Sequence, residues 1–171
     1  GFHLVCDAAN AVAVSELRRR KHRPFKPFAV MTLNDLSASR FVRISEKASK
    51  ELHSPQAPIV LCPKTNDADR LLPGIAPELN RIGIMMPYTP IHWLLFFEAI
   101  GRPEDPDWYK KECDLVLVMT SANAGGEPLV IGNDEAVQKL DGIADLFLTH
   151  NRDILIRCDD SVMQQRDQDV Q

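Results

Sequence analysis

The sequence lacks the cysteine spacing of a metal site. Its four cysteines are Cys6, Cys62, Cys113 and Cys158, and no two of them form a CxxC pair. Structural zinc sites need cysteine or histidine ligands at short, defined spacings, so no zinc site is expected. Three of the four cysteines lie in or beside apolar runs. Unpaired cysteines in such runs usually act as small buried hydrophobic residues and are typical of a reducing compartment. They therefore predict a cytoplasmic protein.

The sequence also lacks a long apolar run and a positive net charge. Its most apolar stretch, residues 91–100, is interrupted by His92 and Glu98. That stretch is far shorter than the roughly 20 apolar residues of a transmembrane helix, so no membrane association is expected. The net charge is −4, whereas a general nucleic-acid coat needs a basic balance. Nucleic acid is therefore not an expected partner, and any anion must be bound by a local group of cations.

Length and composition predict one globular domain. The chain has 171 residues, of which 44% are hydrophobic, enough for an apolar core without metal or disulfide support. It begins at Gly1 without an initiator methionine. We therefore expect residues 1–171 to be a single domain of a larger multidomain protein. The polar end, residues 163–171, is expected to be a frayed tail.

Helical patterns and nearly continuous apolar strands alternate along the chain. Helices are expected over residues 8–22 with Asp7 as N-cap, 34–42, 45–53 with Ser45 as N-cap, 90–100 after Thr89, and 133–140 with Asn133 as N-cap. Strands are expected over residues 27–31, 59–62, 81–86, 114–119, 144–148 and 154–157, and residues 64–80 are expected to form an irregular loop. The alternation predicts an α/β (α+β) fold whose sheet is largely covered by helices.

Residues 20–31 (RKHRPFKPFAVM) concentrate cations where a helix meets a buried strand. Residues 18–21 are explained by the preference of cations for the last turn of a helix. Arg23 and Lys26 lie instead in a proline-stiffened connection, which would hold them in place at a low entropic cost. Arginine can grip phosphate oxygens with two hydrogen bonds and lysine supplies a point charge. From these residues alone, a solvated helix end and an anion site are equally supported.

Three further stretches place polar groups after strands or at a helix start, where open α/β sheets bind ligands. Residues 119–128 (MTSANAGGEP) offer hydroxyl and amide groups beside two glycines, although they lack the Lys-Ser/Thr ending of a Walker loop. Residues 86–92 would put His92 in the first turn of a helix, a position that attracts anions. Arg157 could contact a phosphate, and Asp159 or Asp160, which follow it, could influence a magnesium ion. The structural alternatives are a polar turn, an ordinary capped core helix and a strand-end ion pair.

Six blocks, in order, resemble the YrdC-like domain, most closely its version in the HypF-type carbamoyltransferases of NiFe-hydrogenase maturation. The blocks are GFHLVCDA, LRRRKHRPFKPFAVM, SPQAPIVLCPK, APELNRIGIMMPYTPIHWLL, LVMTSANAGGEP and HNRDILIRCDDSV. Related threonylcarbamoyl-adenylate synthases share the lysine-arginine-proline cluster and the Ser-x-Asn loop. The GFHL, PYTPIHWLL and RCDDSV blocks favour the HypF-type domain.

This resemblance implies a twisted mixed sheet flanked by helices, with a basic concave face that binds ATP. In that family the domain adenylates carbamate, which a separate acylphosphatase-like domain releases from carbamoyl phosphate. The products are carbamoyl-adenylate and pyrophosphate. A following domain passes the carbamoyl group to the C-terminal cysteine of the partner HypE, where it later becomes a cyanide ligand. The implied cofactors are ATP and Mg²⁺, and the other domains of the full-length protein are implied partners.

The resemblance also assigns roles to residues of this chain. Phosphates and the developing pyrophosphate would be bound by Lys21, Arg23 and Lys26, and Arg157 would grip phosphate. The nucleotide and the acyl group would be held by Thr120, Ser121 and Asn123, and His3 and His92 would lie at the substrate end. Lys21, Arg23 and Ser121 would be catalytic. Mg²⁺ would be bound through ATP, and Asp159 or Asp160 could contact it. In-line attack needs positioning and charge neutralisation more than a nucleophile, which fits the missing Ser-His-Asp set.

The chain departs from the family pattern in what it does not contain. It lacks the strand and glycine-rich approach that precede GFHL, and it lacks the acylphosphatase, zinc-finger and transferase parts. The fragment is therefore expected to be only partly active. Two alternatives stay open: a threonylcarbamoyl-adenylate synthase for tRNA modification, and a non-catalytic nucleotide- or RNA-binding module. The acidic composition and the absence of interleaved aromatic and basic residues argue against RNA.

Overall fold

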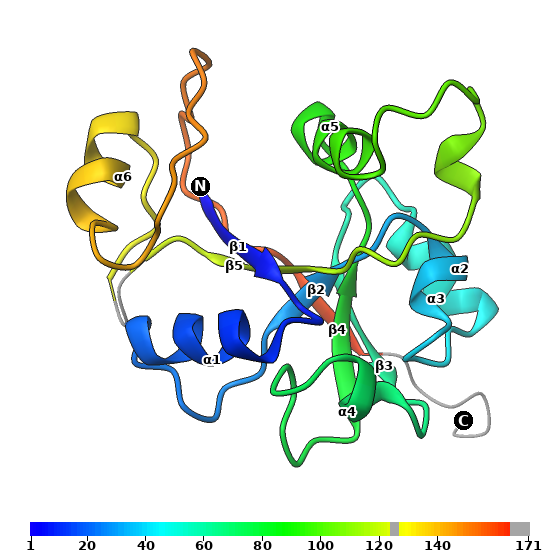
Figure 1. The fold of residues 1–171 in the computed structure, drawn as a ribbon. Coiled ribbons are helices and arrows are strands. Elements are labelled where there is room, and N and C mark those ends of the chain that lie inside the picture. Colours follow the sequence, from blue (N-terminus) through cyan, green and yellow to red (C-terminus); the bar gives the residue numbers. More distant parts are fainter. Residues whose placement is uncertain (124–126, 165–171) are drawn as a thin grey trace.

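One mixed β-sheet organises the computed structural model, which describes residues 1–123 and 127–164 (Figure 1). The sheet has six strands in the order β1–β5–β2–β4–β3–β6. Their bounds are His3–Asp7 (β1), Ala29–Met31 (β2), Ile59–Pro63 (β3), Arg81–Met85 (β4), Leu117–Ser121 (β5) and Val162–Gln164 (β6). β2 pairs with β4 and β3 with β6 in parallel, and the other neighbours are antiparallel. The predicted fold class is thus confirmed.

Helices pack against both faces of this sheet. They are α1 (Ala11–Arg20), α2 (Asp35–Ala38), α3 (Glu46–Leu52), α4 (Ala68–Leu71), α5 (Pro90–Ala99) and α6 (Asn133–Lys139), with a 3₁₀ turn at Trp108–Lys110. Figure 1 shows α1 and α4 on one side of the strands and α5 on the other. Neighbouring strand residues point to opposite faces, so a strand that is apolar after its first residue, such as β4, must be covered on both faces. The short α4 lies within residues 64–80, which were expected to be irregular.

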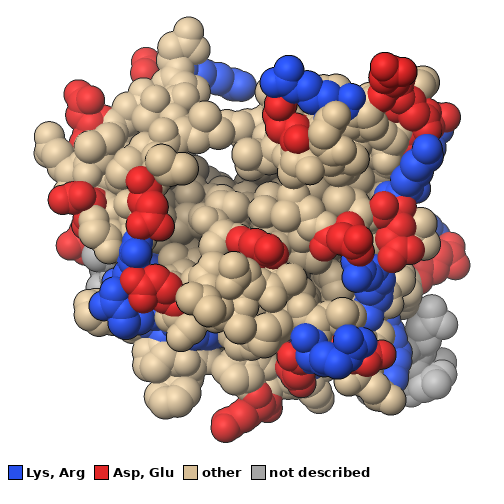
Figure 2. All heavy atoms as spheres, viewed as in Figure 1, with Lys and Arg blue, Asp and Glu red and all other residues tan. Residues whose placement is uncertain are grey.

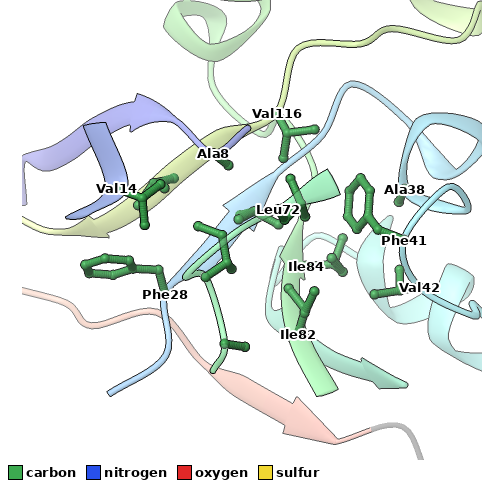
Figure 3. Close-up of a cluster of buried hydrophobic side chains, with 14 of the residues drawn as sticks. Ala8, Val14, Phe28, Ala38, Phe41, Val42, Leu72, Ile82, Ile84 and Val116 are labelled. Carbon is green, nitrogen blue, oxygen red and sulfur yellow. The ribbon is translucent and has the colours of Figure 1, made fainter. Parts of the chain in front are cut away.

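The core accordingly forms two clusters. On the α1 side, Val30, Ile84 and Val118 pack with helix residues and loops, and Figure 3 shows part of this cluster, including Phe28 and Phe41. On the other side, the alternate strand residues pack with Phe96 of α5. The members of this second cluster are Met31, Leu33, Met85, Phe96, Cys113, Leu117 and Met119. The near-continuous apolar strands of the sequence are explained by this double burial.

The helix starts refine the predicted caps. Asn10 rather than Asp7 caps α1, because its side-chain oxygen accepts from the backbone N–H groups of Val12 and Ala13 at 3.1 Å. Asp7 instead ends β1, where its carboxylate accepts from the backbone N–H of Ala9. Both residue types are good N-caps, and only the length of β1 decides between them. The predicted cap Ser45 of α3 is confirmed.

The other two predicted starts are right to within one residue. Asn133 is the first residue of α6 rather than its cap, and Gly132 holds the cap position. Thr89 is the N-cap residue of α5 and Pro90 is its first residue, as predicted, although the Thr89 side chain makes no capping hydrogen bond.

The largest differences lie near the C-terminal end. Residues 144–148 and 154–157 were expected to be strands but are irregular, and Leu146 and Leu155 are 90% and 85% exposed. A β-prone run forms a strand only where it can pair and pack, and these runs find no partner edge among the described residues. Pairing with β3 begins later, at Val162. β6 thus includes residues 163 and 164 of the expected tail, and residues 165–171 lie outside the described part.

Strands β1 and β5 also differ from the prediction. β1 was not predicted as a strand, and β5 begins at Leu117 rather than at residue 114. β1 pairs with β5 along its whole length, from His3 opposite Ser121 to Asp7 opposite Leu117. In the part of the chain that is described, no helix is long and apolar enough to cross a membrane.

Candidate functional site

The end of α1 carries Lys21 to the end of β5. Lys21 occupies the C-cap position of α1, and its side chain is 5% exposed. Its Nζ atom donates hydrogen bonds to the backbone carbonyls of Ser121 (2.7 Å) and Asn123 (2.9 Å), and lies 3.4 Å from Asn123 Oδ1. Ser121 Oγ donates to the same Asn123 Oδ1 at 2.9 Å. The structure therefore brings together residues that are about a hundred positions apart in the sequence.

Arg23 reaches the same strand one residue earlier. Its Nη1 atom donates to Thr120 Oγ1 at 3.1 Å, and its Nη2 atom donates to the backbone carbonyl of Pro27. The guanidinium lies 5.0 Å from the centre of the Phe28 ring, which is buried in the core. The structure thus brings Lys21 and Arg23 together with Thr120, Ser121 and Asn123.

The charges of this group are not balanced by acidic residues. Within residues 1–123 and 127–164, Lys21 and Arg23 bond to carbonyl and hydroxyl oxygens, and no carboxylate forms an ion pair with either. Burial, with a smaller contribution from the nearby charge of Arg23, lowers the pKa of Lys21 to about 8. Burial also lowers the pKa of Arg23. Two partly buried cations without an anionic partner are costly, which marks the group as a candidate for binding an anion.

The neighbouring arginines sort into two kinds. Arg19 and Arg20 pair with Glu16 at 2.7 Å, and Arg20 also pairs with Asp145 at 2.7 Å, so they are the helix-end cations that the sequence predicted. Arg18 belongs to the other group, because its partners are carbonyl oxygens of the proline-rich loop. Arg18 is thus not one of the helix-end cations, contrary to the prediction for residues 18–21. The available signal was its i, i+3 spacing from Lys21, which places both on one face of α1.

Lys26 lies at the surface of the loop between α1 and β2, and its side chain is exposed. Its backbone carbonyl accepts hydrogen bonds from Arg18 at 2.9 Å and from Arg23 at 3.4 Å. The backbone of Lys26 is therefore held beside the cation group while its ammonium stays in solvent.

A second group of polar residues lies on the other side of Ser121. His3 faces Ser121 in the pairing of β1 with β5, and its Nε2 lies 3.2 Å from Asp160 Oδ2. The hydrogen bond with His3 is the main reason why the pKa of Asp160 is lowered. A small cavity of about 60 Å³ opens here. Its lining consists of Gly1, Phe2, His3, Tyr88, Ser121, Leu129, Cys158, Asp159 and Asp160. Ser121 thus connects the cation group with this cavity.

His92 lies in the first turn of α5, next to His3 and Tyr88, which both line that cavity. It is 5% exposed, its Nδ1 accepts from the backbone N–H of Tyr88 at 3.5 Å, and its ring lies 6.3 Å from that of His3. Burial lowers the pKa of His92 to about 4, and the adjacent His3 contributes to the same effect. The imidazole is therefore neutral near pH 7 and offers a hydrogen bond rather than a positive charge.

We expect replacement of His92 by glutamine to remove part of the acid sensitivity of the fold. Between pH 6.5 and about 4 the unfolded chain binds a proton at His92 and the folded chain does not, so stability rises with pH across this window. The group should contribute on the order of 2 kcal/mol between the two ends of the window. Urea unfolding at several pH values measures this difference. The exposed histidine control, His22→Gln, should keep the full slope, and an unchanged slope in His92→Gln would contradict the assignment.

Arg157 takes a supporting position. Its Nε donates to the backbone carbonyl of Leu129 at 2.8 Å, and its guanidinium lies 3.9 Å from Glu135. Leu129 lines the small cavity, so Arg157 braces the wall of that cavity rather than joining Lys21 and Arg23 through a shared contact. Asp159 also lines the cavity. No group of three or more His, Cys, Asp or Glu side chains among the described residues is placed to hold a metal ion.

A larger cavity offers no comparable charge. It measures about 390 Å³, lies between α1, β1 and residues 140–148, and is lined mostly by apolar side chains. Its cation is Arg20, which already pairs with Glu16 and Asp145. On the face shown in Figure 2, acidic and basic side chains are interspersed around a hollow lined mainly by uncharged residues. Unbalanced charge therefore favours the Lys21 and Arg23 group as the anion site.

Comparison with known families and proteins gives a consistent picture. A model of the Sua5/YciO/YrdC family, described as telomere recombination, matches residues 1–171. The chain is 55% identical to carbamoyltransferase HypF2 of Cupriavidus necator over 163 residues, covering 95% of this chain and 20% of that protein. It is 48% identical to carbamoyltransferase HypF of Rhodobacter capsulatus, with the same coverage of 95% and 20%. The chain thus spans about a fifth of the length of the curated relatives that it matches.

Solved structures resemble the fold over nearly the whole chain. A crystal structure of full-length HypF in the phosphate- and nucleotide-bound form matches with a TM-score of 0.83 and 42% identity, covering 96% of this chain and 20% of that one. HypF of T. kodakarensis matches with a TM-score of 0.83 and 43% identity at the same coverage of 96% and 20%. P. abyssi Sua5 complexed with L-threonine has a TM-score of 0.73 at 18% identity, covering 98% of this chain and 45% of that one, which is a likeness of fold alone.

Proposed function

The chain belongs to the Sua5/YciO/YrdC family, and from this premise we propose that it is the carbamate-adenylating domain of a HypF-type carbamoyltransferase. Relatives that are 41–55% identical over about 95% of the chain carry the name carbamoyltransferase HypF, some with a qualifier. Sua5-like proteins share the fold at much lower identity. The HypF-type reading of the six sequence blocks is therefore preferred over the threonylcarbamoyl-adenylate synthase.

The observation that carries the proposal is the unbalanced charge beside the end of β5. Lys21 and Arg23 are partly buried cations held by neutral oxygens, beside the hydroxyl groups of Thr120 and Ser121. A triphosphate would supply the missing negative charge, and its oxygens could replace neutral oxygens that Lys21 and Arg23 now contact. The related full-length HypF has been solved with phosphate and nucleotide bound, which supports a nucleotide as the anion.

The proposed reaction needs in-line geometry and charge neutralisation. A carbamate oxygen attacks the α-phosphorus of ATP and forms a new P–O bond, while the bond from the α-phosphorus to the bridging oxygen breaks. Pyrophosphate leaves with that electron pair, and carbamoyl-adenylate remains. Lys21 and Arg23 would stabilise the negative charge that develops on the leaving phosphates. Ser121 lies between the cations and the cavity of His3 and Asp160, so it would orient the acyl group, with neutral His92 next to His3.

Magnesium would supply further neutralisation of the phosphate charge. Mg²⁺ is commonly held by substrate phosphates, several waters and only one or two carboxylates. The donors here fit that mode, because the cavity wall contains Asp159 and Asp160, and Asp160 is already paired with His3. Asp159 is therefore the better candidate for a contact to the ion.

The wider role of the chain follows from the same proposal. The carbamate would come from carbamoyl phosphate through another domain, and the carbamoyl group would pass to the C-terminal cysteine of HypE in the cytoplasm. Both steps need parts of the full-length protein that lie outside this chain, which covers about a fifth of its relatives.

The decisive measurement is ATP–pyrophosphate exchange with defined acyl donors. Ammonium bicarbonate supplies carbamate in equilibrium, and exchange that depends on it would support the proposal. Exchange that needs threonine plus bicarbonate would indicate a threonylcarbamoyl-adenylate synthase instead. ATP binding without exchange in the presence of any of these donors would indicate a non-catalytic module.

Replacing Arg23 and Lys26 separately should rank their contributions to ATP binding. We expect Arg23→Ala to weaken ATP binding by about 10- to 100-fold, because it removes a charged two-pronged donor. Lys26→Ala should weaken binding by about 3- to 10-fold, since its exposed charge is screened by solvent. Calorimetric titration with ATP measures both. Arg19→Ala is the matched control, because Arg19 is paired with Glu16. Equal affinity in Arg23→Ala and the control would count against a phosphate role for Arg23.

A further inference from the structure

Arg18 connects the proline-rich loop to a second, distant loop. Its Nη1 donates to the backbone carbonyls of residues 23 and 26 at 2.9 Å, and lies 3.4 Å from the carbonyl of Pro24. Its Nε and Nη2 donate to the carbonyl of Gly74 at 2.8 and 2.6 Å, and Nη2 also donates to that of Ile75 at 3.1 Å. The planar guanidinium thus holds two loops at once, which an ammonium with its compact geometry would not do.

The backbone of the second loop is shaped to accept these bonds. Gly74 has a φ of +78°, a conformation that other residue types adopt only with strain, and an added Cβ would lie 3.4 Å from Val14 Cγ1. The backbone N–H of Phe28 donates to the carbonyl of Ile75 at 3.0 Å. The loop after α4 is therefore tied both to Phe28, just before β2, and to Arg18.

Arg18 and Arg23 also share one aromatic ring. The guanidinium carbon of Arg18 lies 4.5 Å from the centre of the Phe28 ring, and that of Arg23 lies 5.0 Å from it. Burial lowers the pKa of Arg18, and the charge of Arg18 contributes to the lowered pKa of Arg23. In the described part of the chain no carboxylate pairs with Arg18. Two like charges held on one ring repel each other, so an anion bound beside them would stabilise the pair.

We infer that Arg18 is a positioning residue of the anion site: by tying the loop of residues 23–27 to Gly74 and Ile75, it holds Arg23 where its guanidinium reaches Thr120. This inference rests on the proposed function for the identity of the anion. It assigns Arg18 no contact with ATP, since its donors are used by backbone carbonyls. Arg18 therefore affects the anion indirectly, because it holds Arg23 in place and fixes the loop backbone at Lys26.

The first test separates the charge of Arg18 from its geometry. ATP affinity is measured by calorimetry for the full chain and for Arg18→Gln, Arg18→Lys and the control Arg19→Gln. Removing the bridge should weaken ATP binding by about 10-fold in Arg18→Gln, and by nearly as much in Arg18→Lys, because lysine keeps the charge but not the forked donors. Full affinity in Arg18→Lys would overturn the inference, since charge alone would then explain the residue.

A double-mutant cycle tests whether Arg18 acts through Arg23. In an Arg23→Gln background, the loss caused by Arg18→Gln should shrink to about 2-fold or less, because the residue that Arg18 positions is gone. If the losses of ATP affinity caused by Arg18→Gln and Arg23→Gln multiply in the double variant, Arg18 does not act through Arg23. Gly74→Ala provides a second variant that shifts the accepting carbonyl and leaves Arg18 in place, and it should weaken ATP binding in the same direction.

Amide hydrogen exchange gives a readout that does not depend on ATP. Residues 22–28 should exchange faster in Arg18→Gln than in Arg19→Gln, because only the former frees the loop. Unchanged exchange of this segment would overturn the inference while leaving the proposed function standing. Conversely, faster exchange in Arg18→Gln together with no ATP binding by the unaltered chain would contradict the proposed function but support the structural role of Arg18.

Discussion

Replacing Lys21 with methionine is expected to weaken ATP binding by about 100-fold and to lower the adenylation rate by about 10²- to 10³-fold. Lys21 is the most buried cation of the site, and its ammonium points at the backbone carbonyls of Ser121 and Asn123. Methionine has nearly the same length but offers neither charge nor donor. The backbone that follows β5 would lose its tie to α1, so both the charge and the shape of the site would change.

The pH dependence of ATP binding gives a sharper form of this prediction. The pKa of Lys21 is lowered to about 8, so above this pH the free chain loses the proton that a phosphate ligand would favour. Affinity should therefore fall as the pH rises above about 8, by up to about tenfold per pH unit, with uptake of a proton on binding. In Lys21→Arg this decline should vanish, since arginine stays charged.

Above pH 8 the contribution of Lys21 to folding stability changes with pH in the opposite direction to its contribution to ATP binding. In the unfolded chain Lys21 keeps its proton up to a pKa near 10.5, whereas the folded chain loses it near 8. The unfolded state therefore binds more protons between these values, and the contribution of Lys21 to stability rises with pH there. Lys50→Met, at an exposed lysine paired with Glu46, is the control for charge removal alone. A Lys21→Met chain with wild-type ATP affinity would rule out the proposed role.

Truncation of Phe28 should have a large effect on the fold itself. The ring is 1% exposed in the main core cluster, and removing such a ring costs about 3–5 kcal/mol of unfolding free energy. Phe28 also carries the guanidiniums of Arg18 and Arg23. Phe28→Ala should therefore lower both the stability of the chain and the ATP affinity of its folded fraction.

Phe41 offers a matched control for that change. It is equally buried, at 1% exposure, in the same cluster, and Figure 3 shows the two rings on opposite sides of Leu72. Phe41→Ala should lose a similar amount of stability but keep its ATP affinity when measured below the unfolding temperature. Urea unfolding and calorimetry provide the two quantities, and Phe28→Leu with Phe41→Leu allows the same comparison at a smaller loss of stability. Equal ATP affinities of Phe28→Ala and Phe41→Ala would show that Phe28 has no role in the site.

Local patterns predicted the elements that are buried on both sides. The strands at 59–63 and 81–85 and the start of α5 at Pro90 follow from continuous apolar runs and from turn or cap signals beside them. Local patterns failed where pairing decides the outcome. Residues 144–148 have the composition of a strand but pair with no strand of the sheet among the described residues, whereas residues 162–164 form a strand because β3 lies beside them.

The site was predictable in part for a similar reason. Thr120, Ser121 and Asn123 follow a buried strand, and the cations follow a helix, so each stretch was identifiable alone. Their meeting across about a hundred residues depends on the pairing of β5 with β2 and β1, which no local pattern encodes. It was the resemblance to a known domain that joined them. Arg18 was missed because a helix-end cation and a loop-holding cation look alike in sequence.

Lys21 and Arg23, which pair with no carboxylate in the described part of the chain, have a practical consequence for solution work. Sulfate, phosphate and citrate carry the same kind of oxygen as a nucleotide and would compete for Lys21 and Arg23. Any anion that binds the folded chain alone also raises its melting temperature. Apparent nucleotide affinity should therefore depend on the buffer, and a chain purified in phosphate should look more heat-resistant and less responsive to ATP than one kept in chloride. Buffer anion is thus an experimental variable for this protein.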